Sequence, residues 1–472
     1  MNIFQKLSLF AFAFLLFQVS AKGQYNPIVG DSTPADTQTI EYMNNLLKAN
    51  KEERASTLQH LDNTWTKEYI PLLLDIAYFS HGDLDAQPIF RLLRKKTGQK
   101  IGTDIHDWLE WLWNEEPEIG SYQANWMAQL YNRIDKRFEK YFLNRSTSAR
   151  IRLDEVRWGG VAQDGIPPLR NPEMIRAEEA DYLKDDHIVF GVSLNGDHRA
   201  YPKRILAWHE MFVDEVGGES IAGVYCTLCG TVIAYNTKHQ GVNYNLGTSG
   251  FLYRSNKLMY DKATQSLWNT IEGKPVIGPL VDQGIELSSH SVITTTWGAW
   301  KKLHPTTTVL SLDTGHRRNY DEGVAYHNYF ATDQLMFNVP KLDNRLLNKD
   351  EVLIVRAEDY QKDPLAIAVK FLKKNPIYYD KIGATEFVVL TDKTGANRVY
   401  ESKGITFVQF NGTTLLDDNG RTWQLTEEQL LADTGQVLQR LPYHRIFWFA
   451  WYNTYEDTRL VGGKKRRSKR TG

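Results

Sequence analysis

Cysteine is scarce in this chain: 472 residues contain two, and they lie three apart in Cys226-Thr227-Leu228-Cys229-Gly230. The absence of a second pair excludes a zinc site closed by two Cys-x-x-Cys turns. A single pair leaves a thiol redox couple or half of a metal site. The apolar run before Cys226 and the glycine after Cys229 predict a strand that enters a tight turn carrying both sulfurs.

The chain also lacks a large net charge and any nucleotide-binding motif. The formal net charge is −1, so no overall field favours a nucleic acid or an acidic partner. No phosphate loop, dinucleotide fingerprint or nucleic-acid-binding motif is present. We therefore expect no nucleotide cofactor and no nucleic-acid partner.

Long apolar runs are absent beyond the first residues. Lys6 precedes an apolar stretch, 7–19, which is followed by the small residues Ser20 and Ala21. This pattern predicts a cleaved signal peptide over residues 1–21, too short to serve comfortably as a membrane span. We expect the mature protein to be periplasmic or secreted, with no transmembrane segment and with a basic, disordered tail over 461–472.

The rest of the chain divides into a helical front and a β-rich back, which predicts an α+β protein. Apolar residues recur at helical spacing in the front portion and indicate a helical domain over 25–150. Short β-branched and aromatic runs separated by turn residues then predict mainly antiparallel sheets. We divide them into a first lobe, 151–340, and a second, degenerate lobe, 341–460.

An internal repeat relates the two lobes. The spacing of Trp297, Trp300 and Thr307 recurs in Trp448, Trp451 and Thr458. In this repeat Cys226 aligns with Thr391, Cys229 with Thr394, His209 with Asn375 and Met259 with Leu415. The second copy lacks all four sulfur and imidazole donors, as expected if they form a site that the fold itself does not require.

A series of ordered motifs resembles a known family. These are Asp164-Gly165-Ile166-Pro167-Pro168-Leu169, Trp208-His209-Glu210, Tyr225 through Gly230, Gly247 through Tyr253, Met259-Tyr260-Asp261 and His304-Pro305-Thr306-Thr307. They resemble the bacterial exported domain-of-unknown-function family numbered three-one-seven-nine, whose hallmark is Tyr-Cys-Pro-Leu-Cys-Gly, over about residues 155–460. Thr227 departs from the family's proline, but both sulfurs are kept. The resemblance implies no activity.

Three interpretations of the cysteine pair stay open. The first is a mononuclear metal site with Cys226, Cys229, His209 and Met259 as ligands, where thiolate and thioether favour copper over zinc. The second is a thiol–disulfide couple, although no helix is predicted after the turn. The third is a structural disulfide in a non-enzymatic module that binds a glycan or a protein. Glu210, beside His209, is the candidate general acid or base. The sequence names no specific partner.

Overall fold

The computed structural model describes residues 34–48, 50–80, 85–115, 117 and 119–464. The predicted signal peptide and most of the predicted basic tail lie outside these residues. Within them, no helix combines the length and the apolar character needed to cross a bilayer.

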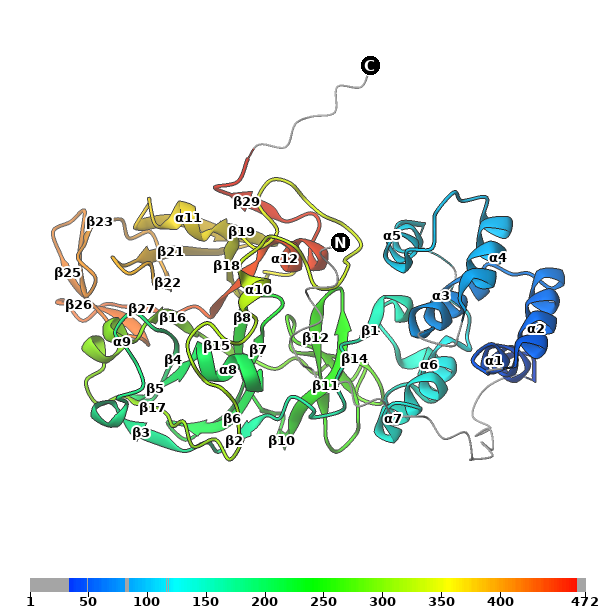
Figure 1. The fold of residues 1–472 in the computed structure, drawn as a ribbon. Coiled ribbons are helices and arrows are strands. Elements are labelled where there is room, and N and C mark those ends of the chain that lie inside the picture. The colour runs from blue at the N-terminus through cyan, green and yellow to red at the C-terminus, as the bar shows by residue number, and fades with distance from the viewer. Residues whose placement is uncertain (1–33, 49, 81–84, 116, 118, 465–472) are drawn as a thin grey trace, which may run out of the picture.

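A helical region forms one end of the molecule (Figure 1). Its helices are α1 (Pro34–Leu46), α2 (Lys51–Asn63), α3 (Tyr69–Phe79), α4 (Gln87–Thr97), α5 (Ile105–Glu115), α6 (Gln123–Asn132) and α7 (Glu139–Phe142). Helix α3 is apolar along nearly its whole length and is buried among the others, whereas α4 buries one face and ends at Gly98 in the left-handed conformation. Trp108 and Trp126 are fully buried, so these tryptophans belong to the core.

The first lobe contains the two-stranded sheet β10-β9 and three five-stranded sheets. The strand orders of the five-stranded sheets are β1-β11-β12-β13-β14, β15-β8-β7-β6-β2 and β16-β4-β5-β17-β3. The strands that matter below are β1 (Val156–Trp158), β4 (Ile188–Leu194), β5 (Asp197–Pro202), β6 (Met211–Val216), β7 (Glu219–Cys226), β8 (Thr231–Asn236), β11 (Leu246–Tyr253), β12 (Asn256–Asp261), β13 (Leu267–Asn269), β14 (Lys274–Ile277), β16 (Ile293–Thr296) and β17 (Thr308–Leu310). The remaining strands are β2 (Leu169–Arg170), β3 (Met174–Arg176), β9 (Lys238–His239), β10 (Val242–Asn243) and β15 (Ser289–His290), and the helices are α8 (Lys203–His209) and α9 (Trp297–Leu303).

The second lobe contains three sheets, with orders β28-β18-β19-β29, β20-β21-β22 and β23-β24-β25-β26-β27. Their bounds are β18 (Glu351–Val355), β19 (Leu365–Ala368), β20 (Ile377–Ile382), β21 (Thr385–Thr391), β22 (Asn397–Glu401), β23 (Phe407–Phe410), β24 (Thr414–Asp417), β25 (Thr422–Leu425), β26 (Gln429–Ala432), β27 (Val437–Gln439), β28 (Tyr443–Phe447) and β29 (Arg459–Val461), with helices α11 (Val369–Leu372) and α12 (Trp448–Thr454). Residues 311–350, here called the connector, join the lobes and contain the short helix α10 (His327–Phe330). The predicted boundary at 340/341 falls inside the connector.

The two lobes share one topology, which confirms the α+β fold with two repeated β-rich lobes. The order β16-β4-β5-β17 matches β28-β18-β19-β29, and β5-β17 and β19-β29 are both parallel pairs; in the first lobe the antiparallel strand β3 extends the sheet further. The indole N–H of Trp300 donates to the hydroxyl of Thr307 (2.8 Å), and Trp451 donates to Thr458 in the same way (2.9 Å). The recurring Trp and Thr spacing is therefore a structural element of each copy.

The hairpin register corrects the alignment of the cysteine turn. Val216 pairs with Glu219 in the first lobe and Ile382 with Thr385 in the second, around Gly217 and Gly383. Cys226 lies nine residues beyond the first of these glycines, and Asp392 lies nine residues beyond the second. Cys226 thus corresponds to Asp392, and its alignment with Thr391 is wrong by one residue. The sequence hid the shift because β7 and β21 are buried on both faces over most of their length, so neither has the alternation of polar and apolar residues that would specify its register.

The cysteine turn after β7 and the corresponding turn after β21 each contact the other lobe. The Phe447 N–H, where β28 joins α12, donates to the Cys229 carbonyl (2.7 Å). Reciprocally, Thr394 of the second lobe's turn lies against Thr295 of β16, with 3.4 Å between the hydroxyl oxygens. The cysteine turn is therefore held at the interface between the lobes.

The helical region docks on the first lobe through one aromatic residue of β11. The Phe251 ring lies 4.7 to 5.1 Å, centroid to centroid, from those of Tyr131, Phe138 and Phe142. A buried ion pair adds to this contact, since Arg157 of β1 donates to Asp75 of α3 (2.6 Å). The region thus covers the sheet whose β11–β12 hairpin reaches the cysteines.

Candidate functional site

The cysteine turn joins β7 to β8, as the sequence predicts. Cys226 pairs with Thr231, so residues 227–230 form the turn, closed by the bond from the Cys229 N–H to the Cys226 carbonyl (3.2 Å). Gly230 has φ +61°, and a Cβ there would lie 2.6 Å from the Phe447 ring. Both the left-handed backbone and the close approach of the second lobe require glycine at this position.

The two sulfurs lie side by side and are shielded from solvent. Their Sγ atoms are 2.8 Å apart, both cysteines are free, and their exposed fractions are 1% and 0%. The Cys226 thiol donates to the Cys229 sulfur, and the Cys229 thiol faces two acceptors, the Ser255 carbonyl and the Asn256 side-chain oxygen, both at 3.4 Å. A disulfide, with sulfurs about 2.05 Å apart, requires only a small approach from this arrangement.

A buried ion pair lies beside the sulfurs. Glu210 ends α8 in the left-handed conformation, with φ +55°, and its carboxylate pairs with the ammonium of Lys257 on β12. The same carboxylate accepts hydrogen bonds from the hydroxyls of Thr227 (2.7 Å) and Tyr326 (2.8 Å). Glu210, predicted as a general acid or base, is thereby linked directly to the turn between the cysteines.

These surroundings shift the pKa values of the two thiols in opposite directions. Burial would raise the pKa of Cys226, but the Cys229 thiol and the backbone N–H and ammonium of Lys257 outweigh burial and lower that pKa. Burial and then the neighbouring Cys226 sulfur raise the pKa of Cys229 well above its ordinary value. The two titrations are coupled, and the pair ionises with its first charge on Cys226.

His209 faces away from the sulfurs in its hydrogen bonding. Its Nδ1 donates to the Pro167 carbonyl (2.9 Å), and its Nε2 accepts from the Tyr320 hydroxyl (2.6 Å). The ring is fully buried, and burial lowers the pKa of His209 to about 4. Neither nitrogen is available as a ligand in this arrangement, so the structure does not bring His209 to the cysteines.

Met259 also belongs to a different part of the core. It lies on β12 opposite Thr248 and Trp268, in a cluster that includes Tyr244 and Leu246 but neither cysteine. Among the residues that the structure describes, no group of three or more His, Cys, Asp or Glu is placed to hold a metal ion. The copper or zinc site stays a prediction that rests on the two cysteines alone.

The connector covers the site from one side. Besides the Tyr326 bond to Glu210, the Tyr329 hydroxyl donates to the Leu228 carbonyl (2.6 Å). The Lys349 ammonium lies 3.3 Å from the centre of the Tyr329 ring. The two tyrosine hydroxyls hold the connector against the turn and its neighbour Glu210, and Lys349 packs on Tyr329 within the connector.

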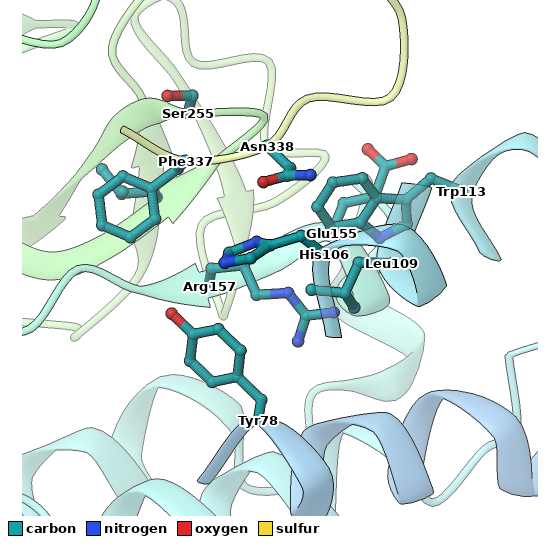
Figure 2. A pocket seen from close by; sticks show the side chains of 10 residues that line it. Tyr78, His106, Leu109, Trp113, Glu155, Arg157, Ser255, Phe337 and Asn338 are labelled. Atoms are coloured by element: carbon teal, nitrogen blue, oxygen red, sulfur yellow. The ribbon is translucent and has the colours of Figure 1, made fainter. Parts of the chain in front are cut away.

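Two cavities flank the β11–β12 hairpin tip, Arg254-Ser255, where both residues have positive φ. The smaller, about 20 Å³, lies between the helical region and Ser255. Figure 2 shows Arg157 in it between Tyr78 and Leu109, with Ser255 at the far side from Tyr78. That volume suits a single water molecule. The larger, about 160 Å³, is lined by Asn256, whose side chain also accepts from Cys229.

Sequence reasoning missed the groups that surround the thiols from other elements. Lys257 lies on β12 in the sheet that begins with β1, Tyr326 lies in the connector, and Phe447 lies in the second lobe. Lys257 is two residues from the motif Met259-Tyr260-Asp261, which is the one signal that pointed to its neighbourhood. The other two lie in stretches with no chemical motif.

A family model described as "Protein of unknown function (DUF3179)" matches residues 163–458, more than half of the chain. No curated protein and no solved structure matches the chain. The helical region before residue 163 lies outside the match.

Proposed function

Since the chain belongs to the DUF3179 family of proteins of unknown function, we propose its activity from its own residues: Cys226 and Cys229 form a thiol–disulfide redox couple. One observation carries this proposal. The sulfurs are 2.8 Å apart in a buried site that favours a thiolate on Cys226 and a thiol on Cys229. Such a difference between two adjacent cysteines is typical of dithiols that cycle.

The surroundings support a couple that oxidises its substrates. A buried ammonium and a donating thiol stabilise the Cys226 thiolate, which exists only in the reduced protein. Stabilising the reduced form makes a couple more oxidising. We propose that it operates outside the cytoplasm, where disulfides persist, as the signal-peptide pattern in residues 1–21 predicts.

The decisive test is a redox titration of the mature protein. Protein equilibrated in thiol–disulfide buffers of graded potential is quenched, alkylated and weighed by mass spectrometry, which counts its free thiols. We expect a reversible two-electron transition with a midpoint between roughly −120 and −230 mV, the range of disulfide-exchange proteins. Cys226→Ser and Cys229→Ser should each abolish it.

Two results would contradict the proposal, and each supports one of the other interpretations. A midpoint below about −300 mV indicates a structural disulfide, as in the binding-module interpretation. Stoichiometric copper or zinc in protein purified without added metal, lost in both cysteine variants, indicates the metal site. Elemental analysis therefore accompanies the titration.

A further inference from the structure

The larger cavity at the hairpin tip gives a molecule from solvent its route towards the thiol pair. Asn256 lines this cavity, and its side-chain oxygen accepts from the Cys229 thiol. On the opposite side the connector is fixed to the turn by the Tyr326 and Tyr329 hydroxyls. Neither sulfur lines the cavity, and the Asn256 side chain separates it from Cys229, so a molecule in the cavity reaches Cys229 only by displacing that side chain.

The cavity is small and polar. Its volume is about 160 Å³, equivalent to about five water molecules in the liquid and below the range of drug-sized ligand sites. Three asparagines line it: Asn256, Asn269 and Asn453. A low-molecular-weight substrate fits this space, whereas a folded protein cannot reach the sulfurs through it.

The charges in the wall select among small substrates. Arg254 lines the cavity, but its guanidinium is paired with Glu155. The Glu272 carboxylate accepts hydrogen bonds from Tyr455 (3.0 Å) and Asn269 (3.0 Å), both neutral groups. The nearby Arg356 donates to backbone carbonyls of residues 271 and 272 rather than to this carboxylate. The wall therefore offers a negative charge that a substrate ammonium can approach.

We infer that this cavity binds low-molecular-weight thiols that carry a protonated amine, and that such an aminothiol attacks Cys229 of the oxidised pair. The inference rests on the proposed redox function. The substrate thiolate forms a bond to the Cys229 sulfur, the Cys226–Cys229 bond breaks, and the electron pair leaves on Cys226. A mixed disulfide between the substrate and Cys229 then occupies the cavity.

The choice of sulfur follows from leaving-group chemistry. A disulfide is cleaved faster when the expelled thiol has the lower pKa, and the surroundings lower the pKa of Cys226 and raise that of Cys229. A second substrate thiolate attacks the substrate sulfur of the mixed disulfide and releases Cys229, which takes up a proton. Two thiols are oxidised to one disulfide, and one protein disulfide is reduced to a dithiol.

The experiment measures single-turnover reduction of the oxidised protein by three thiols of similar size: cysteamine, 2-mercaptoethanol and 3-mercaptopropionate, with rates expressed per thiolate. We expect cysteamine to react at least tenfold faster than 3-mercaptopropionate. In Glu272→Gln the ratio should fall to about threefold or less. An unchanged ratio in this variant overturns the inference.

A second pair of variants tests the route independently of charge. Thr454→Trp, at the end of α12, fills the cavity, and Leu303→Trp is its counterpart at the end of α9, which does not line it. We expect Thr454→Trp to slow cysteamine at least tenfold and Leu303→Trp to match the wild type. Equal rates in both variants overturn the inference, as does faster reduction by a reduced protein dithiol than by cysteamine. If no disulfide forms at all, the redox proposal itself has failed.

Discussion

The buried ion pair beside the thiols leads to a prediction in which two substitutions act in opposite directions. Lys257→Met removes a positive charge that lowers the pKa of Cys226, and Glu210→Gln removes a negative charge that raises it. We expect the pKa of Cys226 to rise in the first variant and to fall in the second. Simple structural damage at this site has no reason to produce shifts of opposite sign.

The magnitude follows from the burial of the pair. The side chains of Lys257 and Glu210 are 8% and 5% exposed, so solvent screens them little. At an effective dielectric constant of about 20, a unit charge about 5 Å away contributes about 3 kcal/mol, or roughly two pKa units. The Lys257 backbone N–H remains in the variant, so we expect an increase of about one to two units for Lys257→Met and a decrease of about one unit for Glu210→Gln.

Stability and redox potential provide two further readouts. Removing one partner of a buried pair costs about 3–5 kcal/mol, so each single variant should unfold at lower denaturant concentration. The double variant should lose less than the sum of the single losses, because it leaves no uncompensated charge. The midpoint potential should become more negative in Lys257→Met, by up to about 30 mV for each unit that the pKa of Cys226 rises.

The assay follows thiolate absorbance and the rate of alkylation of Cys226 against pH in the reduced protein, with folding monitored by circular dichroism. Cys229 is kept in both variants, since its thiol also lowers the pKa of Cys226. Shifts of the same sign in Lys257→Met and Glu210→Gln, or shifts below about a third of a unit, would refute the reasoning. The ion pair would then hold the turn in place without acting on its chemistry.

Three other predictions concern the turn and its neighbours. The double variant Cys226→Ser and Cys229→Ser should keep the fold and melt close to the reduced wild type, because the second lobe builds the same hairpin without sulfur; collapse of the fold would contradict this. Gly230→Ala should lower the free energy of unfolding by about 1–3 kcal/mol in denaturant titration, because a Cβ there would lie 2.6 Å from the Phe447 ring. Gly395→Ala should lower it less, because the Cβ would contact only the flexible side chain of Lys373. Burial lowers the pKa of His209 to about 4, so the unfolded chain binds more protons between pH 6.5 and 4 and stability falls as pH falls through that window. His209→Asn, which carries the residue found at the equivalent position 375, should flatten that slope in pH-dependent unfolding.

The parts of the fold that the sequence predicted are those carried by local patterns. Helical spacing placed the front region, alternating apolar runs placed the sheets, and the recurrence of Trp300 and Thr307 in Trp451 and Thr458 placed the repeat. In the structure each tryptophan of these two pairs hydrogen-bonds to its threonine. A pattern of this kind is readable because both partners lie seven residues apart in one segment.

The surroundings of the thiols could not be predicted in this way, because they are assembled from segments far apart in the chain. Lys257 and Glu210 are 47 positions apart, and their contact depends on how two sheets pack. Tyr326 comes from the connector, which has no repeating apolar pattern. His209 was expected beside the sulfurs because the second lobe lacks it together with the two cysteines, but its ring is held by Pro167 and Tyr320 instead.

The corrected register strengthens the argument that the site is an addition to the fold. Cys226 corresponds to Asp392, whose carboxylate accepts the backbone N–H groups of Thr394 and Ala396 and so closes its own turn. Because that carboxylate also accepts from Arg398 (3.2 Å), the second lobe satisfies this position with ordinary turn chemistry. In the first lobe the same position holds a sulfur beside a buried ion pair, an arrangement that costs desolvation free energy and that the second lobe's turn forms without. The proposed redox role of the cysteine pair would account for that cost, and the opposed shifts expected for Lys257→Met and Glu210→Gln test it directly.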